Sequence, residues 1–124
     1  MTRFGTALIT GGGTGIGRAV ALALAARGHE VIVTGRRGAL LDETVQLIES
    51  TGGLARAEVL DVTDPVAVSR LSELARGKQV DVVVVNAGSF VRGSISDLDI
   101  EGWSTQIDVN LNGAFYCIRE AVRV

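Results

Sequence analysis

The chain has 124 residues and a formal net charge of −2, from 12 basic and 14 acidic side chains. This length predicts one domain, and a hydrophobic content of 47% is enough for a buried core. A slightly acidic chain without a long basic run does not favour nucleic-acid binding. The apolar runs are too short for a membrane span, and the N-terminus lacks the apolar core of a secretion signal. A single cysteine, Cys117, cannot form an internal disulfide, which is typical of a cytoplasmic protein.

Apolar runs and amphipathic segments alternate in the first half of the chain. Residues 7–9 form a short apolar run that predicts a buried strand. Residues 15–27 follow with apolar side chains at helical spacing, Ile16 among them. Residues 31–33 predict a second buried strand, and residues 40–50 predict a second helix that ends before a pair of glycines.

The second half continues this alternation. Residues 57–60 predict a weaker strand, and Asp64 with Pro65 marks the start of a helix. The valine-rich residues 80–85 predict a strand that is buried on both faces, as in a parallel sheet. A last amphipathic helix is predicted from about Val109, with one apolar face formed by Val109, Ala114, Phe115, Ile118, Ala121 and Val122.

Four strands that alternate with helices predict a parallel sheet with right-handed crossovers. The predicted fold class is therefore α/β, a Rossmann-like doubly wound sheet in three layers, of which the first four strands and their helices are present. We assign residues 1–124 to the N-terminal part of one NAD(P)-binding domain. The chain ends inside its last predicted helix and leaves a valine-rich strand at an edge, so we expect a truncated piece, with a naturally short product as the alternative.

A glycine-rich loop, Thr10–Gly17, joins the first predicted strand to the first predicted helix. Glycines allow positive φ angles and a close approach of a ligand to the main chain. A helix N-terminus offers free N–H groups and partial positive charge to a pyrophosphate. The loop therefore predicts a dinucleotide site, the alternative being a glycine-rich turn without a ligand. The residues predicted to bind are Thr10, Gly11, Gly13, Thr14, Gly15, Ile16 and Gly17.

The loop and three later motifs resemble, in order, the short-chain dehydrogenase/reductase family, whose cofactor motif is Thr-Gly-x-x-x-Gly-x-Gly. The later motifs are Asp61-Val62, Asn86-Ala87-Gly88 and Asn110. The resemblance implies that Asp61 touches the adenine, that Asn86-Ala87-Gly88 follows the fourth strand beside the cofactor, and that Asn110 belongs to the catalytic tetrad. Each motif also has a structural interpretation: Asp61 could bond a turn N–H, Asn86-Ala87-Gly88 could only terminate a strand, and Asn110 could be an ordinary helix residue.

The residues after the second strand indicate which dinucleotide is preferred. An NAD-preferring fold usually carries an acid there for the ribose 2′-hydroxyl, whereas this chain reads Gly35-Arg36-Arg37. Guanidinium groups pair with a 2′-phosphate, which an acid would repel. The sequence thus predicts NADP(H) over NAD(H), with Arg36 as the main contact and Arg37 as a helper. The alternative is that both arginines are only solvated.

The resemblance implies hydride transfer between nicotinamide and a small carbonyl or alcohol substrate, with a Tyr as acid/base and a Lys four residues later. The single tyrosine is Tyr116, and residue 120 is Glu120. A carboxylate there opposes phenolate formation. His29, the single histidine, is expected in a solvated turn, which favours neither histidine catalysis nor a metal site. We therefore predict a catalytically incomplete part of an oxidoreductase, the alternative being an inactive half-domain that binds a nucleotide or a partner.

The resemblance also implies a homo-oligomer, because the segment from about Val109 onward is similar to the region through which members of the family dimerise. Its apolar face could equally belong to the core of the same chain.

Overall fold

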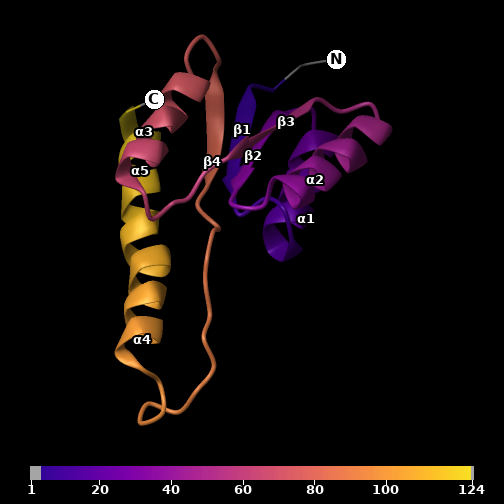
Figure 1. Ribbon diagram of the computed structural model, residues 1–124. Coiled ribbons are helices and arrows are strands. Elements are labelled where there is room, and N and C mark those ends of the chain that lie inside the picture. The colour runs from indigo at the N-terminus through magenta and orange to yellow at the C-terminus, as the bar shows by residue number, and fades with distance from the viewer. Residues whose placement is uncertain (1–3, 124) are drawn as a thin grey trace.

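The computed structural model describes residues 4–123 as a parallel sheet with helices on both of its faces (Figure 1). The observed alternation of strands and helices confirms the predicted order. The elements are β1 (Thr6–Thr10), α1 (Gly15–Ala26), β2 (Glu30–Gly35), α2 (Gly38–Ser50), β3 (Ala55–Val59), α3 (Pro65–Leu74), β4 (Val80–Val84), α4 (Ile100–Ile107), the π-helical segment η1 (Asp108–Gly113) and α5 (Ala114–Arg123).

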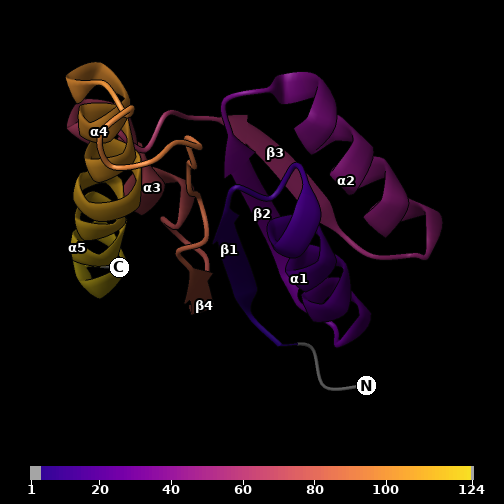
Figure 2. The ribbon, with the colours of Figure 1, turned by 90° about the horizontal axis from the view of Figure 1, so that it is seen from below.

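The strand order is β3-β2-β1-β4, and every neighbouring pair is parallel. The chain moves outward from β1 through β2 to β3, and α3 then carries it back to the other side of β1. Ligands of open α/β sheets bind beyond the carboxyl ends of the strands where the order reverses, here between β1 and β4. Figure 2 shows α1 and α2 on one side of the sheet and α3 and α5 on the other. This is the predicted Rossmann-like α/β arrangement.

Two hydrophobic cores lie on the two faces of the sheet, because successive strand side chains point to opposite faces. In β1, Ala7 and Ile9 pack under α1 and α2, whereas Leu8 packs toward α3 and α5. The same alternation in β2 sends Val31 and Ile32 to opposite cores. Burial on both faces explains why these strands are continuously apolar in sequence.

Residues 80–85 were predicted to be buried on both faces of the sheet, but they are only partly buried. Val82 and Val84 pack against one core and Val83 and Val85 against the other, but all four remain partly exposed. Within residues 4–123, β4 hydrogen-bonds to β1 alone, so it forms an edge of the sheet. Its outer side therefore keeps contact with solvent.

The last predicted helix differs in its start and in its buried face. Helical structure begins at Ile100 and passes through η1 before α5, whereas a start near Val109 was predicted. Phe115, Ile118 and Val122, on the predicted apolar face, are exposed, so the alternative that this face belongs to the core of the same chain does not hold for them. The inward face instead carries Cys117 and Glu120.

Small side chains decide which face of the last helix packs inward. A Cβ added at Gly113 would lie 2.8 Å from Cγ2 of Val62, so only glycine allows this close approach. Cys117 continues the same narrow face and is fully buried in the core beneath α3. The larger apolar side chains of α5 are left on its outer surface.

Ile16, at the end of the predicted dinucleotide loop, is 76% exposed in the first turn of α1. The prediction for His29 needs correction. His29, predicted to be solvated, is partly buried, with its ring stacked on Phe4 at 5.1 Å between centroids. Its Nδ1 also lies 3.1 Å from the Gly5 carbonyl oxygen. Among the helices of residues 4–123, none has both the length and the apolar character that crossing a bilayer requires.

Candidate functional site

A cleft of about 140 Å³ lies at the carboxyl ends of the strands. Its walls come mainly from four segments, namely the loop after β1, the start of α2 with the turn before it, the segment after β3 and the segment after β4, and Val109 of η1 completes them. These four segments are far apart in sequence, so the fold brings together most of the motifs predicted from it. The lining residues are Gly11, Gly13, Thr14, Gly35, Arg36, Arg37, Leu40, Leu41, Leu60, Asp61, Val62, Ala87, Gly88 and Val109.

The glycine loop needs its glycines for two different reasons. Gly11 and Gly15 have φ angles of +68° and +53°, which side-chain-bearing residues rarely adopt. Gly17 is buried, and a Cβ there would collide with the Gly11 carbonyl and lie 2.6 Å from Nδ2 of Asn86. At Gly15 a Cβ would meet no described atom within 4 Å, so this residue borders open space. The loop is thus closely packed at Gly17, against Gly11 and Asn86, and leaves free space beside Gly15.

The first turn of α1 differs from those of two other helices. Asp64 and Asp99 accept hydrogen bonds from the first amides of α3 and α4. Thr14, the N-cap of α1, makes no such bond within residues 4–123, and the first turn of α1 has no acidic residue. Its first N–H groups and the positive end of its dipole are therefore available to an anion.

Thr10 and Asn86 hold the end of β4 against the glycine loop. The buried Thr10 Oγ1 accepts from the backbone N–H groups of Asn86 and Ala87, each at 3.0 Å. Asn86 Nδ2 donates to the carbonyl oxygens of Thr10 and Gly11, at 3.2 and 3.3 Å. Of the predicted Asn86-Ala87-Gly88 motif, Ala87 and Gly88 line the cleft. Thr10 and Asn86 instead use their polar atoms to fix the loop.

Positive charge lines the cleft where β2 ends. Arg36 and Arg37 are exposed, and within the described chain neither forms an ion pair within 4 Å. Arg37 is the N-cap of α2 and has an extended backbone. The neighbouring Gly35, which has no carboxylate, lines the same cleft.

Asp61 forms the turn that one of its two interpretations predicted. Its Oδ1 accepts from the backbone N–H of Thr63 at 2.9 Å and from the Thr63 hydroxyl at 2.8 Å. The backbone bond lowers the pKa of Asp61 most; partial burial opposes this, while the Thr63 hydroxyl and the positive charge of Arg36 lower it further. Asp61 and Val62 also line the cleft, so the turn and the predicted adenine contact are compatible.

Asn110 lies in η1 and links it to the segment after β4. Its Oδ1 accepts from the backbone N–H of Ser89 and its Nδ2 donates to the Ser89 carbonyl, both at 2.8 Å. A Cβ at Gly88 would lie 3.4 Å from the same Oδ1. Asn110 therefore lies in a π-helical segment, a rare conformation that occurs frequently at functional sites, and both of its side-chain polar atoms bind the Ser89 backbone.

Tyr116, the single tyrosine, lies away from the cleft. Tyr116 packs against the core that contains Leu8 and Cys117, and it is not among the described residues that line the cleft.

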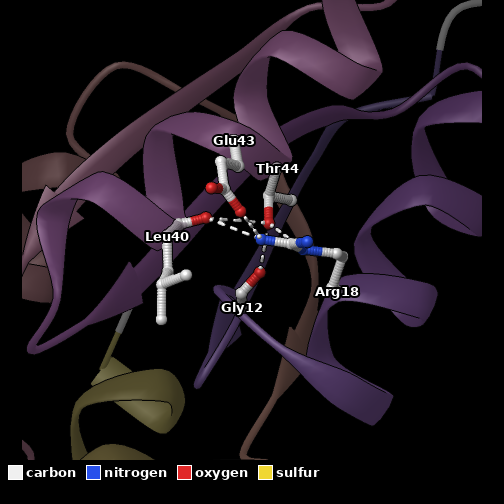
Figure 3. A network of polar contacts seen from close by, with 5 residues as sticks. All are labelled: Gly12, Arg18, Leu40, Glu43 and Thr44. Carbon is white, nitrogen blue, oxygen red and sulfur yellow. Dashed lines mark hydrogen bonds and ion pairs between the residues drawn. The ribbon is translucent and has the colours of Figure 1, made fainter.

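A network around Arg18 and Thr44 connects the glycine loop to α2, and the sequence analysis missed it (Figure 3). The available signal was a polar threonine at helical spacing within the buried stripe of α2.

Comparisons with known proteins agree with this architecture. The sequence model of the family described as short chain dehydrogenase matches residues 5–124. The chain is 40% identical to the 2-dehydro-3-deoxy-D-gluconate 5-dehydrogenase of Bacillus subtilis over 119 residues, which cover 95% of this chain and 46% of that protein.

Two solved structures are similar to the whole described fold. A 3-oxoacyl (acyl-carrier-protein) reductase from Agrobacterium tumefaciens with NADP bound superposes with a TM-score of 0.88 at 32% identity, covering 98% of this chain and 47% of that one. A metagenomic short-chain oxidoreductase in complex with NADP gives a TM-score of 0.86 at 28% identity, covering 93% and 53%.

The chain thus spans about half the length of the relatives it matches. The family match covers nearly all of the chain, and the fold, the order of the motifs and the solved structures agree with it. The chain belongs to the short-chain dehydrogenase/reductase family, whose members are oxidoreductases that use a nicotinamide cofactor.

Proposed function

We propose that residues 1–124 form the N-terminal, dinucleotide-binding part of an NADP(H)-dependent oxidoreductase. One observation carries this proposal: a glycine-rich helix start without a side-chain cap and two guanidinium groups without an ion pair, both as judged within residues 4–123, line the same cleft. Both features favour phosphate groups, and a 2′-phosphorylated dinucleotide carries phosphates that suit each of them.

The residues of the cleft fit a dinucleotide. Gly15 leaves open space beside the uncapped amides of α1, where a pyrophosphate would be held. Asp61 and Val62 would border the adenine, and Ala87 and Gly88 would border the nicotinamide half. Thr10 and Asn86 would act indirectly, by fixing the loop. The residues proposed to surround the pyrophosphate are Gly11, Gly13, Thr14, Gly15, Ile16 and Gly17.

The preference for NADP(H) over NAD(H) is proposed from charge. Arg36 and Arg37 line the cleft, and Gly35 offers no carboxylate to a ribose 2′-hydroxyl. A guanidinium group can bind a 2′-phosphate through two hydrogen bonds, whereas NAD(H) has no phosphate at that position. The NADP in the two solved relatives supports the same preference.

The chemistry proposed is hydride transfer to a carbonyl, or from an alcohol, of a small substrate. The nicotinamide ring, when bound, supplies or accepts the hydride. Asn110 fixes the Ser89 backbone at the rim of the cleft, where it would help shape the substrate side. We propose that the proton donor lies outside these 124 residues, because Tyr116 packs in the core and Glu120 occupies the position of the expected lysine.

Calorimetric titration of the purified protein with NADPH and NADH tests the proposal. We expect tighter binding of NADPH. Arg36→Ala should weaken NADPH binding by roughly tenfold to a hundredfold, the range for a hydrogen bond to a charged group, while NADH binding stays unchanged. Arg70→Ala, which removes an exposed arginine on α3, is the matched control. Tighter binding of NADH, or no binding of either dinucleotide, would contradict the assignment.

A second candidate is an inactive half-domain that binds a nucleotide or a partner without redox chemistry. The packed Tyr116 favours it, because no tyrosine of the described chain then reaches the cleft. The full-length protein distinguishes the two candidates. NADPH-dependent reduction of a panel of small carbonyl compounds supports the enzyme, whereas tight NADPH binding without any turnover supports the half-domain.

We propose a homo-oligomer from the outer face of the last helix. Leu111, Phe115, Ile118 and Val122 are large apolar residues that are more than half exposed, and they follow one another at helical spacing. A second copy of the same face would cover them. Light scattering should report a dimer or a larger assembly for the wild type and a smaller species for Phe115→Glu. A monomeric wild type would contradict this proposal.

A further inference from the structure

A buried threonine holds one carbonyl of the glycine loop. Thr44, on α2, is fully buried, and its hydroxyl donates to the Gly12 carbonyl oxygen at 2.8 Å. The Thr44 hydroxyl oxygen in turn accepts from Nε of Arg18 at 3.0 Å, so the arginine orients the hydroxyl toward the loop (Figure 3). A hydroxyl has one hydrogen to donate, and the short bond to Gly12 uses it.

Arg18 also binds the start of α2. Its Nη2 donates to the Leu40 carbonyl at 3.1 Å and to Oε2 of Glu43 at 3.0 Å. Arg18 lies in the first turns of α1, directly after the glycine loop, and α2 begins directly after Arg36 and Arg37. One side chain therefore connects the two segments that form opposite walls of the cleft.

The hydrogen bonds of Gly12 fix the peptide planes on both of its sides. Its N–H donates to the Thr34 carbonyl at 3.1 Å, and its carbonyl accepts from Thr44. Because a trans peptide is planar, with its N–H opposite to its C=O, the bond from Thr44 sets the direction of the Gly13 N–H. Gly13 lines the cleft, and a Cβ there would lie 3.2 Å from Cβ of Leu40. The loop is thus held firmly against α2.

We infer that Arg18 and Thr44 are positioning residues for the dinucleotide. Neither lines the cleft, but together they fix the glycine loop relative to the start of α2. The loop amides and the Arg36 guanidinium can then act on one ligand without a cost of ordering the two walls. This inference rests on the proposed dinucleotide binding and adds to it two residues outside the family motifs.

The inference predicts a loss of affinity that a merely stabilising network would not produce. Thr44→Val keeps the shape of the side chain and removes the hydroxyl, whereas Thr44→Ser keeps the hydroxyl. We expect Thr44→Val to weaken NADPH binding by roughly threefold to tenfold, the range for one hydrogen bond, and Thr44→Ser to restore it. NADH binding should weaken by a smaller factor, because NADH has no 2′-phosphate for Arg36 and therefore gains less from the fixed arrangement of the two walls.

Calorimetric titration of the purified protein, well below the melting temperature of each variant, measures these affinities. Arg18→Met provides a second variant in case Thr44→Val folds poorly, and it should also weaken the binding of NADPH more than that of NADH. Glu49→Gln is the matched control, because it removes an exposed carboxylate from the same helix, α2, and leaves Arg18 and Thr44 unchanged. 2′,5′-ADP, which lacks the nicotinamide half, should show the same loss as NADPH.

The outcomes separate this inference from the proposed function. A folded Thr44→Val or Arg18→Met variant that binds NADPH with the wild-type Kd would overturn the inference alone. Equal losses in Thr44→Ser and Thr44→Val would also overturn it, because the hydroxyl would then not be responsible. A wild-type protein that binds no dinucleotide would overturn the proposed function and the inference with it.

Discussion

Gly17→Ala changes one atom at the place where the glycine loop is tightest. Gly17 is buried in the first turn of α1, and its φ is not positive, so the backbone there is ordinary for any residue. The obstacle is steric: a Cβ would collide with the Gly11 carbonyl and lie 2.6 Å from Nδ2 of Asn86. A backbone carbonyl and a side chain that is already hydrogen-bonded cannot both move aside without disturbing the loop.

The expected cost follows from two opposing effects. Alanine improves helix propensity by up to about 1 kcal/mol over glycine. Overpacking at a buried site costs about 1–3 kcal/mol, and more where the contacts are backbone atoms. We expect the steric effect to exceed the propensity gain, so that Gly17→Ala lowers the free energy of unfolding by about 1–2 kcal/mol. Because Gly11 must shift, NADPH affinity should fall together with stability.

The matched control for this variant is Gly15→Ala. Gly15 has a φ of +53° and no described atom near its missing Cβ, so alanine there adds backbone strain without a collision. Urea unfolding measures the stability of both variants, and calorimetry with NADPH measures their affinity. A Gly17→Ala protein with the stability and the NADPH affinity of the wild type would refute the steric reasoning.

Three further predictions concern a cap, a carboxylate and a thiol. The Asp64 carboxylate caps α3 by accepting two amide hydrogen bonds at 3.0 and 3.3 Å. Asp64→Ala should therefore lower the free energy of unfolding in urea by about 1 kcal/mol, and an unchanged urea midpoint would contradict this. The pKa of Asp61 is lower in the folded protein than its ordinary value of 3.8. The ionised carboxylate therefore contributes its full stabilisation above pH 3.8, and this stabilisation is lost as the pH falls through the lower pKa of the folded state. Asp61→Asn should therefore flatten the stability profile of the protein below about pH 4, and an equally steep profile would be inconsistent with the turn. Burial raises the pKa of the Cys117 thiol to about 11, so a thiol reagent should label the unfolded protein at about pH 8 and not the folded one. Rapid labelling of the folded protein would show that this helix face opens.

Local patterns predicted the elements and the residues of the cleft, because both depend on short stretches of sequence. The continuous apolar run of β2 and the glycine spacing after β1 each carry their own physical reason. The family resemblance, and not the order of the elements, suggested that Asp61 lies beside the cofactor with the glycine loop, and both segments line the cleft.

Features that depend on distant partners were not predictable in this way. The inward face of α5 is chosen by the close approach of Gly113 to Val62, and helical periodicity alone favoured the larger residues on the other face. The link between Arg18 and Thr44 spans two helices, and neither residue belongs to a motif. Such contacts require knowledge of which elements pack together, which the sequence of a single chain does not supply.

A crystal structure of the protein grown with NADPH tests the central claim most directly. The account predicts diphosphate oxygens within hydrogen-bond distance of backbone N–H groups between Gly13 and Gly17, and the 2′-phosphate on the guanidinium of Arg36. A dinucleotide bound elsewhere, or a glycine loop without a ligand at saturating NADPH, would contradict the account.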